Sequence, residues 1–520
     1  MSTALVWFRK CLRLHDNPAL WEVCQDAQIE SILPIFILDP EIVGPQFEKY
    51  GINRIRFLFE NLNDLENQIQ SKCNNSLLIF WGSPQDAVQS LQSALGDKLT
   101  LLSSDYCSEP YGRKISDLLE QSSAIKTHFH PATHTILDLE ETISQPGFKN
   151  PKSMKDIEKI FTSSFPKDAE GYFKIPTPLK EPAKIKNAPD DFSFTTISSH
   201  FSGEVYSVSS LKTKLSELGF LQATNENAHF KGGETEALTR LKHKVSSQPD
   251  YVNGFRKPKT SSTNLPENPL EPSTTGLSPY ITVGSLSVRR LWHEVEKANR
   301  QGPHSSPPES LHGQLLFREM FYILSLSVPN WDSDQDNSMC KKINWGKNDN
   351  AKLSAWTDGQ TGFPLIDALM RQLETTGWMH HLGRHAVSCF LTRGQLWQHW
   401  KTGRDVFDQK LLDSDWALNN ANWLWLSGVA PFSMPYFRLY NPCPDGKSSL
   451  NVDATEANFI RHWVPELKNF PVKYIYEPHL APPTVQEESR CVIGKDYPKP
   501  MVDRKAVAKE NLAQFKASLN

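Results

Sequence analysis

The stretch WMHHLGRHAVSCFLTRGQLWQHWKTGRDVFDQKLLDSDWALNNANWLW, residues 378–425, says most about the fold of this chain. His381 and His385 are four residues apart, so a helix would place both imidazoles on one face. Carboxylate and amide side chains follow between 413 and 420. Tryptophan, of which the whole chain has 14, is concentrated in this stretch. No one of these features decides the function, whereas their combination and order do.

Each of these features also has a simpler interpretation. Two histidines at helical spacing are often packing or surface residues, and Asp or Asn often caps a helix. Tryptophans in a large helical domain are mostly core residues. A zinc pair is disfavoured because HExxH is absent and no cysteine lies at finger spacing. We therefore expect no metal ion.

Length and composition limit the class of protein. A chain of 520 residues predicts two or more domains. No apolar run reaches the length of a membrane span, and the N-terminus has no signal-peptide layout. The eight cysteines form no CxxC pair, which is typical of reduced thiols in a soluble intracellular protein. Because the net charge is −3, binding to nucleic acid would require a local basic surface.

Residues 1–130 alternate between strand and helix signals. Short apolar runs at 4–8, 31–38, 77–80 and 99–102 alternate with helical segments such as 54–69. This alternation predicts βαβ units and a parallel sheet. Gly-rich dinucleotide fingerprints are missing, so the Rossmann-like prediction concerns architecture and not NAD binding.

The rest of the chain divides into two parts. Residues 131–225 are rich in Pro, Ser and Lys, which predicts an interdomain linker with a few short helices, or alternatively a disordered insert. Residues 226–520 have helical patterns. The predicted fold class is an α/β N-terminal Rossmann-like domain with a parallel sheet, joined by a long linker to an all-α C-terminal domain.

Several motifs, in order along the chain, resemble the photolyase/cryptochrome family of flavoproteins. They are WFRKCLRLHDNPAL (7–20), KGGETEALTRL (231–241), STTGLSPYITVGSLS (273–287), GQLLFREMFY (313–322), AWTDGQTGFPLIDALMRQL (355–373) and the stretch 378–425. The string HHLGRH resembles the branch of (6-4) photolyases and animal-type cryptochromes. The resemblance implies an antenna-binding domain at 1–130 and a helical FAD-binding and DNA-lesion domain at 226–520.

The resemblance also implies the cofactors and the residues that hold them. FAD is expected, with Asn419 facing flavin N5 and an ion pair of Arg384 with Asp413 beside the ring. An antenna chromophore is expected too, either 8-hydroxy-5-deazaflavin or methenyltetrahydrofolate. Hydroxyl side chains just before a helix also suit the flavin pyrophosphate. The implied FAD-binding residues are Thr274, Thr275, Ser278, Arg318, Arg384, Asp413, Asp415 and Asn419.

Three tryptophans match the electron-transfer triad of the family. Trp423 is expected nearest the flavin, Trp400 in the middle and Trp345 nearest solvent. For Trp345, plain core packing remains an alternative.

The two histidines match the pattern of (6-4) repair. This chemistry moves a hydroxyl between two pyrimidines and needs a proton donor, and an imidazole with a pKa near neutrality suits that role. The resemblance implies that His381 is the general acid and that His385 positions it or shares the proton. The residues expected to contact the lesion or DNA are Gln314, Phe317, Trp425, Tyr440 and Lys257.

Two departures from the pattern matter. Phe317 stands where family members usually have Trp, and 427–446 looks more like the cyclobutane-dimer repair class.

The predicted function is blue-light-driven, FAD-dependent repair of (6-4) photoproducts. One alternative is an animal-type cryptochrome photoreceptor or transcription regulator, with a dual role open; another is a cyclobutane-dimer photolyase. Since such cryptochromes usually extend well past the flavin domain, the end at Asn520 favours repair.

The partner expected from this function is UV-damaged double-stranded DNA with the lesion flipped out of the helix. We expect a monomer in the nucleus, without membrane contact. The cryptochrome alternative would add a circadian or signalling protein partner.

Overall fold

The computed structural model describes residues 2–122, 124–190, 192, 197, 199–221 and 228–519. Contacts divide the chain into two compact units. The first comprises Met1–Phe255 and Leu277–Ser327, and the second comprises Arg256–Gly276 and Val328–Asn520.

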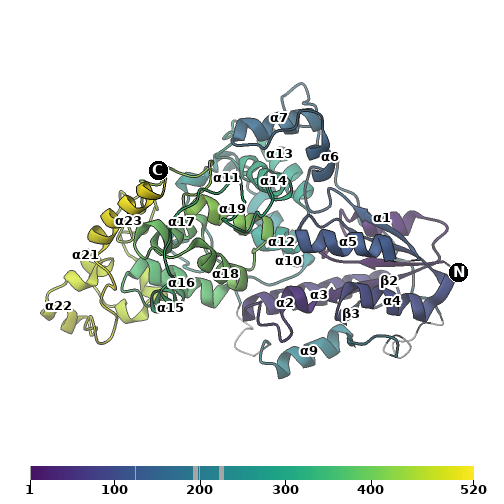
Figure 1. Cartoon of the computed structure of the whole chain (residues 1–520), viewed down its shortest axis with the longest axis horizontal. Helices are drawn as coiled ribbons and strands as arrows, with labels where there is room; N and C mark the ends of the chain where they lie inside the picture. The colour runs from purple at the N-terminus through teal and green to yellow at the C-terminus, as the bar shows by residue number, and fades with distance from the viewer. Residues whose placement is uncertain are drawn as a thin grey trace. The chain divides into compact units, whose positions relative to one another are not determined.

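A six-stranded sheet forms the centre of the first unit, with the strand order β5-β4-β1-β2-β3-β6. Two of its strands, β2 and β3, are labelled in Figure 1. Neighbouring strands are parallel except for β6, which runs antiparallel to β3. The strands are β1 (Thr3–Trp7), β2 (Ser31–Leu38), β3 (Leu78–Trp81), β4 (Leu99–Asp105), β5 (Lys126–His130) and β6 (Glu204–Tyr206).

Helices cover both faces of this sheet, because alternate side chains of a strand point to opposite sides. In β1, Ala4 and Val6 join a core cluster with residues of α1, α3 and α9. Leu5 and Trp7 join a second cluster with residues of α4 and α5. The bounds of these helices are α1 (Pro18–Gln25), α3 (Ile52–Lys72), α4 (Pro84–Leu95), α5 (Pro110–Ser122) and α9 (Val208–Glu217).

The predicted parallel sheet is confirmed, and the strand predicted at 31–38 has the same bounds in the structure. Two strands were not predicted. β5 has the sequence KTHFH, which lacks an apolar run because it lies at the edge of the sheet. β6 has three residues and lies in the predicted linker, where its pairing with β3 outweighs a weak local signal.

The other helices of the first unit lie on both sides of the predicted boundary at 225/226, between the linker and the helical domain. The boundary at 225/226 itself falls outside the described residues. Helices α10 to α14, which we assigned to the helical domain, group by contacts with the first unit. These helices are α2 (Pro40–Val43), α6 (Leu139–Ser144), α7 (Met154–Ser164), α10 (Glu234–Leu241), α11 (Pro249–Gly254), α12 (Ser278–Val283), α13 (Val288–Asn299) and α14 (Leu311–Ser327).

The second unit is helical and has a core rich in tryptophan. Trp331, Trp356, Trp400 and Trp423 are among the largest fully buried side chains. Its helices are α15 (Asn350–Thr357), α16 (Pro364–Thr376), α17 (His381–Cys389), α18 (Trp400–Lys410), α19 (Trp416–Leu426), α20 (Asn458–Trp463), α21 (Val472–Ile475), α22 (Pro483–Glu488) and α23 (Arg504–Ser518).

All eight cysteines are free thiols. Among the described residues, we find no helix with the length and apolar character needed to span a membrane.

Candidate functional site

The candidate site of the second unit is built on α17, which begins at His381. His380 caps this helix, because its Nδ1 accepts the backbone N–H of Leu382 at 3.1 Å. Its Nε2 lies 3.0 Å from the hydroxyl of Thr260, to which it donates since Nδ1 is the acceptor. His380 is fully buried and held at both nitrogens. It fixes the start of the helix that presents the other two histidines.

His381 and His385 lie on one face of α17, as predicted from their spacing. Their ring centroids are 5.9 Å apart and their planes are nearly perpendicular. Among the residues that the structure describes, none forms a hydrogen bond with the His381 ring nitrogens, and this side chain is half-buried. His381 is therefore available to a ligand.

His385, in contrast, is anchored by Tyr440. The Tyr440 hydroxyl donates to Met434 Sδ at 3.2 Å, so it accepts from His385 Nδ1–H at 2.7 Å. This arrangement leaves Nε2 of the neutral ring as a proton acceptor. The ring of Trp425, also predicted to line the lesion pocket, lies 6.4 Å from His385. The structure thus brings Tyr440 and Trp425 together with the histidine pair.

Three cations act on these imidazoles. Burial, together with Lys257, Arg384 and neighbouring rings, lowers the pKa of His380 to about 3, and burial with Lys257 and Arg393 lowers the pKa of His385 to about 3. The pKa of His381 is also well below its ordinary value, chiefly because of burial. The expectation of a near-neutral pKa does not hold for the protein alone, because desolvation and positive neighbours both favour the neutral ring.

Lys257 and Arg384 make this part of the second unit electropositive. Burial and the nearby Arg384 lower the pKa of Lys257 to about 8, which still leaves the amine mostly charged at neutral pH. Arg384 donates through Nη2 to both carboxylate oxygens of Asp413, at 3.0 and 2.8 Å, and through Nε to the Met379 carbonyl. The expected ion pair of Arg384 with Asp413 is present. Its position would suit an anionic ligand.

Asp415 and Asn419 stand at the start of α19. Asp415 is its N-cap and accepts the backbone N–H of Leu418 at 3.1 Å, which confirms the helix-cap interpretation. Asn419 donates through Nδ2 to the Arg404 carbonyl at 3.0 Å and is 8% exposed. Its Oδ1 accepts no hydrogen bond from any residue within the described part of the chain. A nearly buried amide oxygen without a donor fits the N5–H of a reduced flavin.

The predicted triad lies in the core of the second unit. Trp423 and Trp400 are fully buried, and Trp345 is 3% exposed. The ring of His399 lies between Trp345 and Trp400, with centroids at 6.4 and 5.8 Å. Trp400 opens α18, and α18 packs against α19, which carries Trp423. Trp345 has the largest exposed fraction of the three, although it too is buried, so its place as the ring nearest solvent stays a prediction.

Trp397 is a residue that the sequence analysis missed. Its ring centroid lies 5.0 Å from that of Trp345, and its side chain is half-buried. Its φ is +54°, in the left-handed region, where a bulky residue is strained by about 1–3 kcal/mol. The preceding helical turn, Phe390–Gly394, is a π turn with a kink at Thr392. A tryptophan held in this strained position extends the row of rings from Trp345 toward the surface.

Four predicted site residues belong to the first unit: Gln314, Phe317 and Arg318 on α14, and Ser278 on α12. Gln314 of α14 donates to the Pro308 carbonyl at 2.8 Å, whereas its buried Oε1 has no donor among the described residues. Phe317, on the same helix, is half-buried with its ring 6.3 Å from that of Phe321. Ser278 is the exposed first residue of α12.

Arg318 forms hydrogen bonds within the first unit. It donates to the His134 carbonyl at 2.8 Å and to Glu319 at 3.1 Å. Glu319 in turn accepts the backbone N–H groups of Ile136 and Leu137. Arg318 and Glu319 are both buried, so neither is a surface charge. The role of Arg318 at the cofactor stays a prediction, as do those of Thr274 and Thr275, which are half-buried.

The segment 427–446 is held by Arg393. This buried side chain donates through Nη1 to the carbonyls of Tyr436 and Arg438, at 2.7 and 2.8 Å, and through Nε to Leu426. The contact fixes the backbone from which Tyr440 reaches His385. Phe437, on the same segment, is 61% exposed.

Comparison with known proteins identifies the class first. The FAD binding domain of DNA photolyase matches residues 310–517, and the family described as DNA photolyase matches residues 4–180. The chain is therefore a flavoprotein with an N-terminal α/β domain and a helical FAD-binding domain. A bacterial class III photolyase from Agrobacterium tumefaciens has a similar fold, with a TM-score of 0.76, 23% identity and coverage of 100% of this chain and 98% of the other.

Relatives of the whole chain give the family. A (6-4)DNA photolyase of Oryza sativa subsp. japonica is 38% identical over 523 residues, covering 98% of this chain and 88% of that protein. Cryptochrome-1 of Rattus norvegicus is also 38% identical, over 522 residues, covering 99% of this chain and 82% of that protein. The chain belongs to the photolyase/cryptochrome family. Because a photolyase and a cryptochrome match equally well, the comparisons establish the family but not the activity.

Proposed function

We propose that this protein uses blue light and FAD to repair (6-4) pyrimidine–pyrimidone photoproducts in UV-damaged double-stranded DNA. The observation that carries the proposal is the histidine pair of α17. His381 has no hydrogen-bond partner among the described residues, and His385 is oriented by Tyr440 beside it. One imidazole that is free for a ligand and one that is held in a defined tautomer suit proton transfer to a flipped lesion.

Residues of this chain would hold FAD as the family resemblance implies. FAD supplies an electron when it is bound in its reduced form and absorbs blue light. Asn419 Oδ1 is an available acceptor, and the Arg384–Asp413 pair offers charged hydrogen-bonding groups. The proposed FAD-binding residues are Thr274, Thr275, Ser278, Arg318, Arg384, Asp413, Asp415 and Asn419.

Proton transfer depends on the charge of the ligand. In the protein alone, His381 is neutral because burial and the neighbouring cations oppose its protonation. Phosphates of the DNA or an anionic cofactor would reverse that field and raise the pKa, since an opposite charge within a few ångströms favours the charged form. His381 would then donate its proton to the lesion and become neutral, while His385 positions the His381 ring or shares that proton with it before the transfer. This predicts an acid that is charged only when substrate is bound.

Contacts with DNA are proposed for the same unit. Lys257 would neutralise phosphate charge, which makes binding strongly dependent on salt. Phe437, 61% exposed, is followed by the exposed Arg438 on the segment 427–446. When a lesion flips out of the duplex it leaves a gap in the base stack. An exposed ring next to a guanidinium suits insertion into such a gap. Trp425 and Tyr440 are the proposed lesion contacts of this unit. Gln314 and Phe317, which belong to the first unit, are also proposed to contact the lesion or DNA.

Electrons to reduce the flavin would come through the tryptophans. We propose the order Trp423, Trp400 and Trp345, with Trp397 as the outermost ring. The closely spaced rings Trp345–Trp397 and Trp345–His399–Trp400 support this order. The buried Nε1 atoms of Trp400 and Trp423 have no acceptor among the described residues, so a change to Phe would remove no hydrogen bond. Trp400→Phe should slow photoreduction of oxidised flavin and leave repair by pre-reduced protein near the parental rate.

The deciding experiment offers reduced flavoprotein two oligonucleotides under blue light, one with a (6-4) photoproduct and one with a cyclobutane dimer. We expect restoration of the first only, lost in His381→Ala and retained in His462→Ala, which removes an exposed histidine of the same unit. Flavin content should be the same in all three proteins. Repair of the dimer alone would overturn the lesion assignment and make 427–446 the determinant of specificity.

A cryptochrome function is the second candidate, favoured by the 38% identity to rat Cryptochrome-1. It predicts bound, photoreducible flavin without repair of either lesion, and a circadian or signalling protein as partner. For the repair function we propose a monomer in the nucleus. We further propose that residues 1–130 hold an antenna chromophore, 8-hydroxy-5-deazaflavin or methenyltetrahydrofolate, that 131–225 are the linker, and that 226–520 carry FAD and the lesion.

A further inference from the structure

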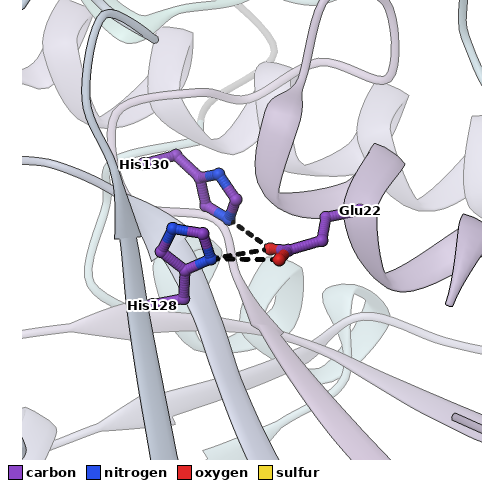
Figure 2. A group of neighbouring side chains, drawn as sticks. All are labelled: Glu22, His128 and His130. Atoms are coloured by element: carbon purple, nitrogen blue, oxygen red, sulfur yellow. Dashed lines mark hydrogen bonds and ion pairs between the residues drawn. The ribbon is translucent and has the colours of Figure 1, made fainter. Parts of the chain in front are cut away.

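Two histidines and a glutamate converge in the first unit, among residues that the proposed function does not use (Figure 2). His128 Nδ1 lies 2.9 and 3.1 Å from the two carboxylate oxygens of Glu22. His130 Nε2 lies 2.9 Å from Glu22 Oε2. One nitrogen or oxygen atom from each of the three side chains lies within 4.8 Å of the others.

The sheet geometry produces this convergence. His128 and His130 are two residues apart on β5, so both side chains point to the same face of the sheet. The side chain between them, Phe129, packs against the core cluster of the opposite face. Glu22 projects from α1, which packs on β4 and β5. Figure 2 shows both imidazole rings directed at the Glu22 carboxylate from the strand.

The Ser103 hydroxyl of β4 also lies close to the His130 nitrogen that faces Glu22. It lies 2.9 Å from His130 Nε2 and donates to the Ala19 carbonyl at 3.2 Å, so a bound ion would replace it as a partner of that nitrogen. The His128 and His130 rings are 4.0 Å apart, so two positive charges here would repel each other.

We propose that Glu22, His128 and His130 form a binding site for a divalent transition-metal ion, with Zn²⁺ the best match. Two imidazole nitrogens and one carboxylate oxygen are a donor set that zinc uses, with a fourth position for water. A tetrahedral ion with bonds of about 2.0–2.1 Å holds its ligand atoms about 3.4 Å apart. The distances from 2.9 to 4.8 Å bracket that value, so small side-chain rotations would complete the site.

The exposure of the three side chains suits reversible binding. Those of His128 and Glu22 are 43% and 38% exposed, whereas that of His130 is 10% exposed. An ion could enter from solvent and keep a water ligand while the buried His130 fixes its depth. Once bound, the ion would join α1 to β5, an edge strand of the sheet. The site would therefore stabilise the edge of the first unit independently of flavin and DNA.

The test uses the full-length flavoprotein, freed of metal with a chelator and then titrated with Zn²⁺ by calorimetry. We expect one site per chain that is lost in a His128→Ala/His130→Ala double variant. The single change Glu22→Gln should raise the Kd at least about tenfold, by analogy with the effect of losing even a ligand's supporting partner. The control is His243→Ala, which removes an exposed histidine of the same unit and should leave the Kd unchanged.

Two further readouts keep the proposal open to refutation. Co²⁺ in the site should give the visible absorption of a tetrahedral ion without the near-ultraviolet band of thiolate ligands, which separates it from binding at cysteines. Zn²⁺ should raise the unfolding temperature of the parent and not of His128→Ala, whose half-exposed side chain can be removed with little effect on folding. Equal Zn²⁺ binding by the parent and the double variant would show that the three residues form a hydrogen-bonded ion pair only.

Discussion

Replacing Gly403 with alanine would disturb the packing of Trp423, the tryptophan expected nearest the flavin. Gly403 lies in α18, and a Cβ atom added there would lie 2.1 Å from Trp423 Cη2 and 2.6 Å from Leu391 Cδ2. Contacts below 3.0 Å essentially never occur, so the indole or the helix has to move. Trp423 and Leu391 are both fully buried, which leaves no free space for that movement.

The size of the effect follows from two opposing terms. Overpacking a core costs about 1–3 kcal/mol, and an overlap of more than 1 Å with a ring belongs at the upper end. Alanine in place of glycine within a helix stabilises by about 1 kcal/mol. We therefore expect Gly403→Ala to lower the free energy of unfolding by about 2 kcal/mol. For a unit of roughly 200 residues this corresponds to a fall in Tm of about 4–8 °C.

Two measurements check this expectation. Thermal unfolding should show the fall in Tm, and photoreduction of oxidised flavin should be slower because the displaced indole is a poorer electron donor. The matched control is Gly446→Ala in the same unit, where the new Cβ would meet only Ala454 Cβ at 3.6 Å. The control should behave like the parent. A Gly403→Ala protein with parental Tm and parental photoreduction would refute the claim that this contact holds Trp423.

Three other changes test the site. Tyr440→Phe removes the acceptor of His385 Nδ1–H. The repair rate should fall about tenfold at unchanged flavin content, as expected for the loss of a hydrogen bond worth about 1.4 kcal/mol. An unchanged repair rate would show that Tyr440 has no part in the mechanism. Asn419→Ala should retain flavin but shorten the lifetime of the reduced form in air, measured by absorbance. Burial lowers the pKa of His380 to about 3 in the folded chain. Below about pH 6.5 the unfolded chain therefore binds a proton at this residue that the folded chain does not bind. Because of this difference, the free energy of unfolding falls as the pH is lowered. His380→Asn keeps a capping side chain. In denaturant unfolding at pH 4–6, it should reduce the change of the free energy of unfolding with pH by up to about 1.4 kcal/mol per pH unit. An unchanged dependence on pH would mean that His380 is not the titrating group.

Local signals in the sequence determined many of the regular elements, although not the edge strands β5 and β6. An uninterrupted apolar run predicted β2 with its observed bounds, because a parallel strand buried on both faces needs apolar residues throughout. The spacing of His381 and His385 was enough to place both on one helical face, and Asp415 was recognisable as a helix cap. The resemblance to the family supplied the pairing of Arg384 with Asp413, which no local pattern contains.

The tertiary structure alone decided the contacts between distant parts of the chain. Tyr440 orients His385 across 55 positions, and Trp397 meets Trp345 only because a strained turn places it there. The lowered pKa values of the histidines depend on Lys257, more than 120 positions away, and on burial that periodicity does not measure. The meeting of Glu22 with His128 and His130 likewise depends on the packing of α1 against β5. Periodicity reports which face of an element is buried, whereas chemistry at a site depends on which faces are brought together.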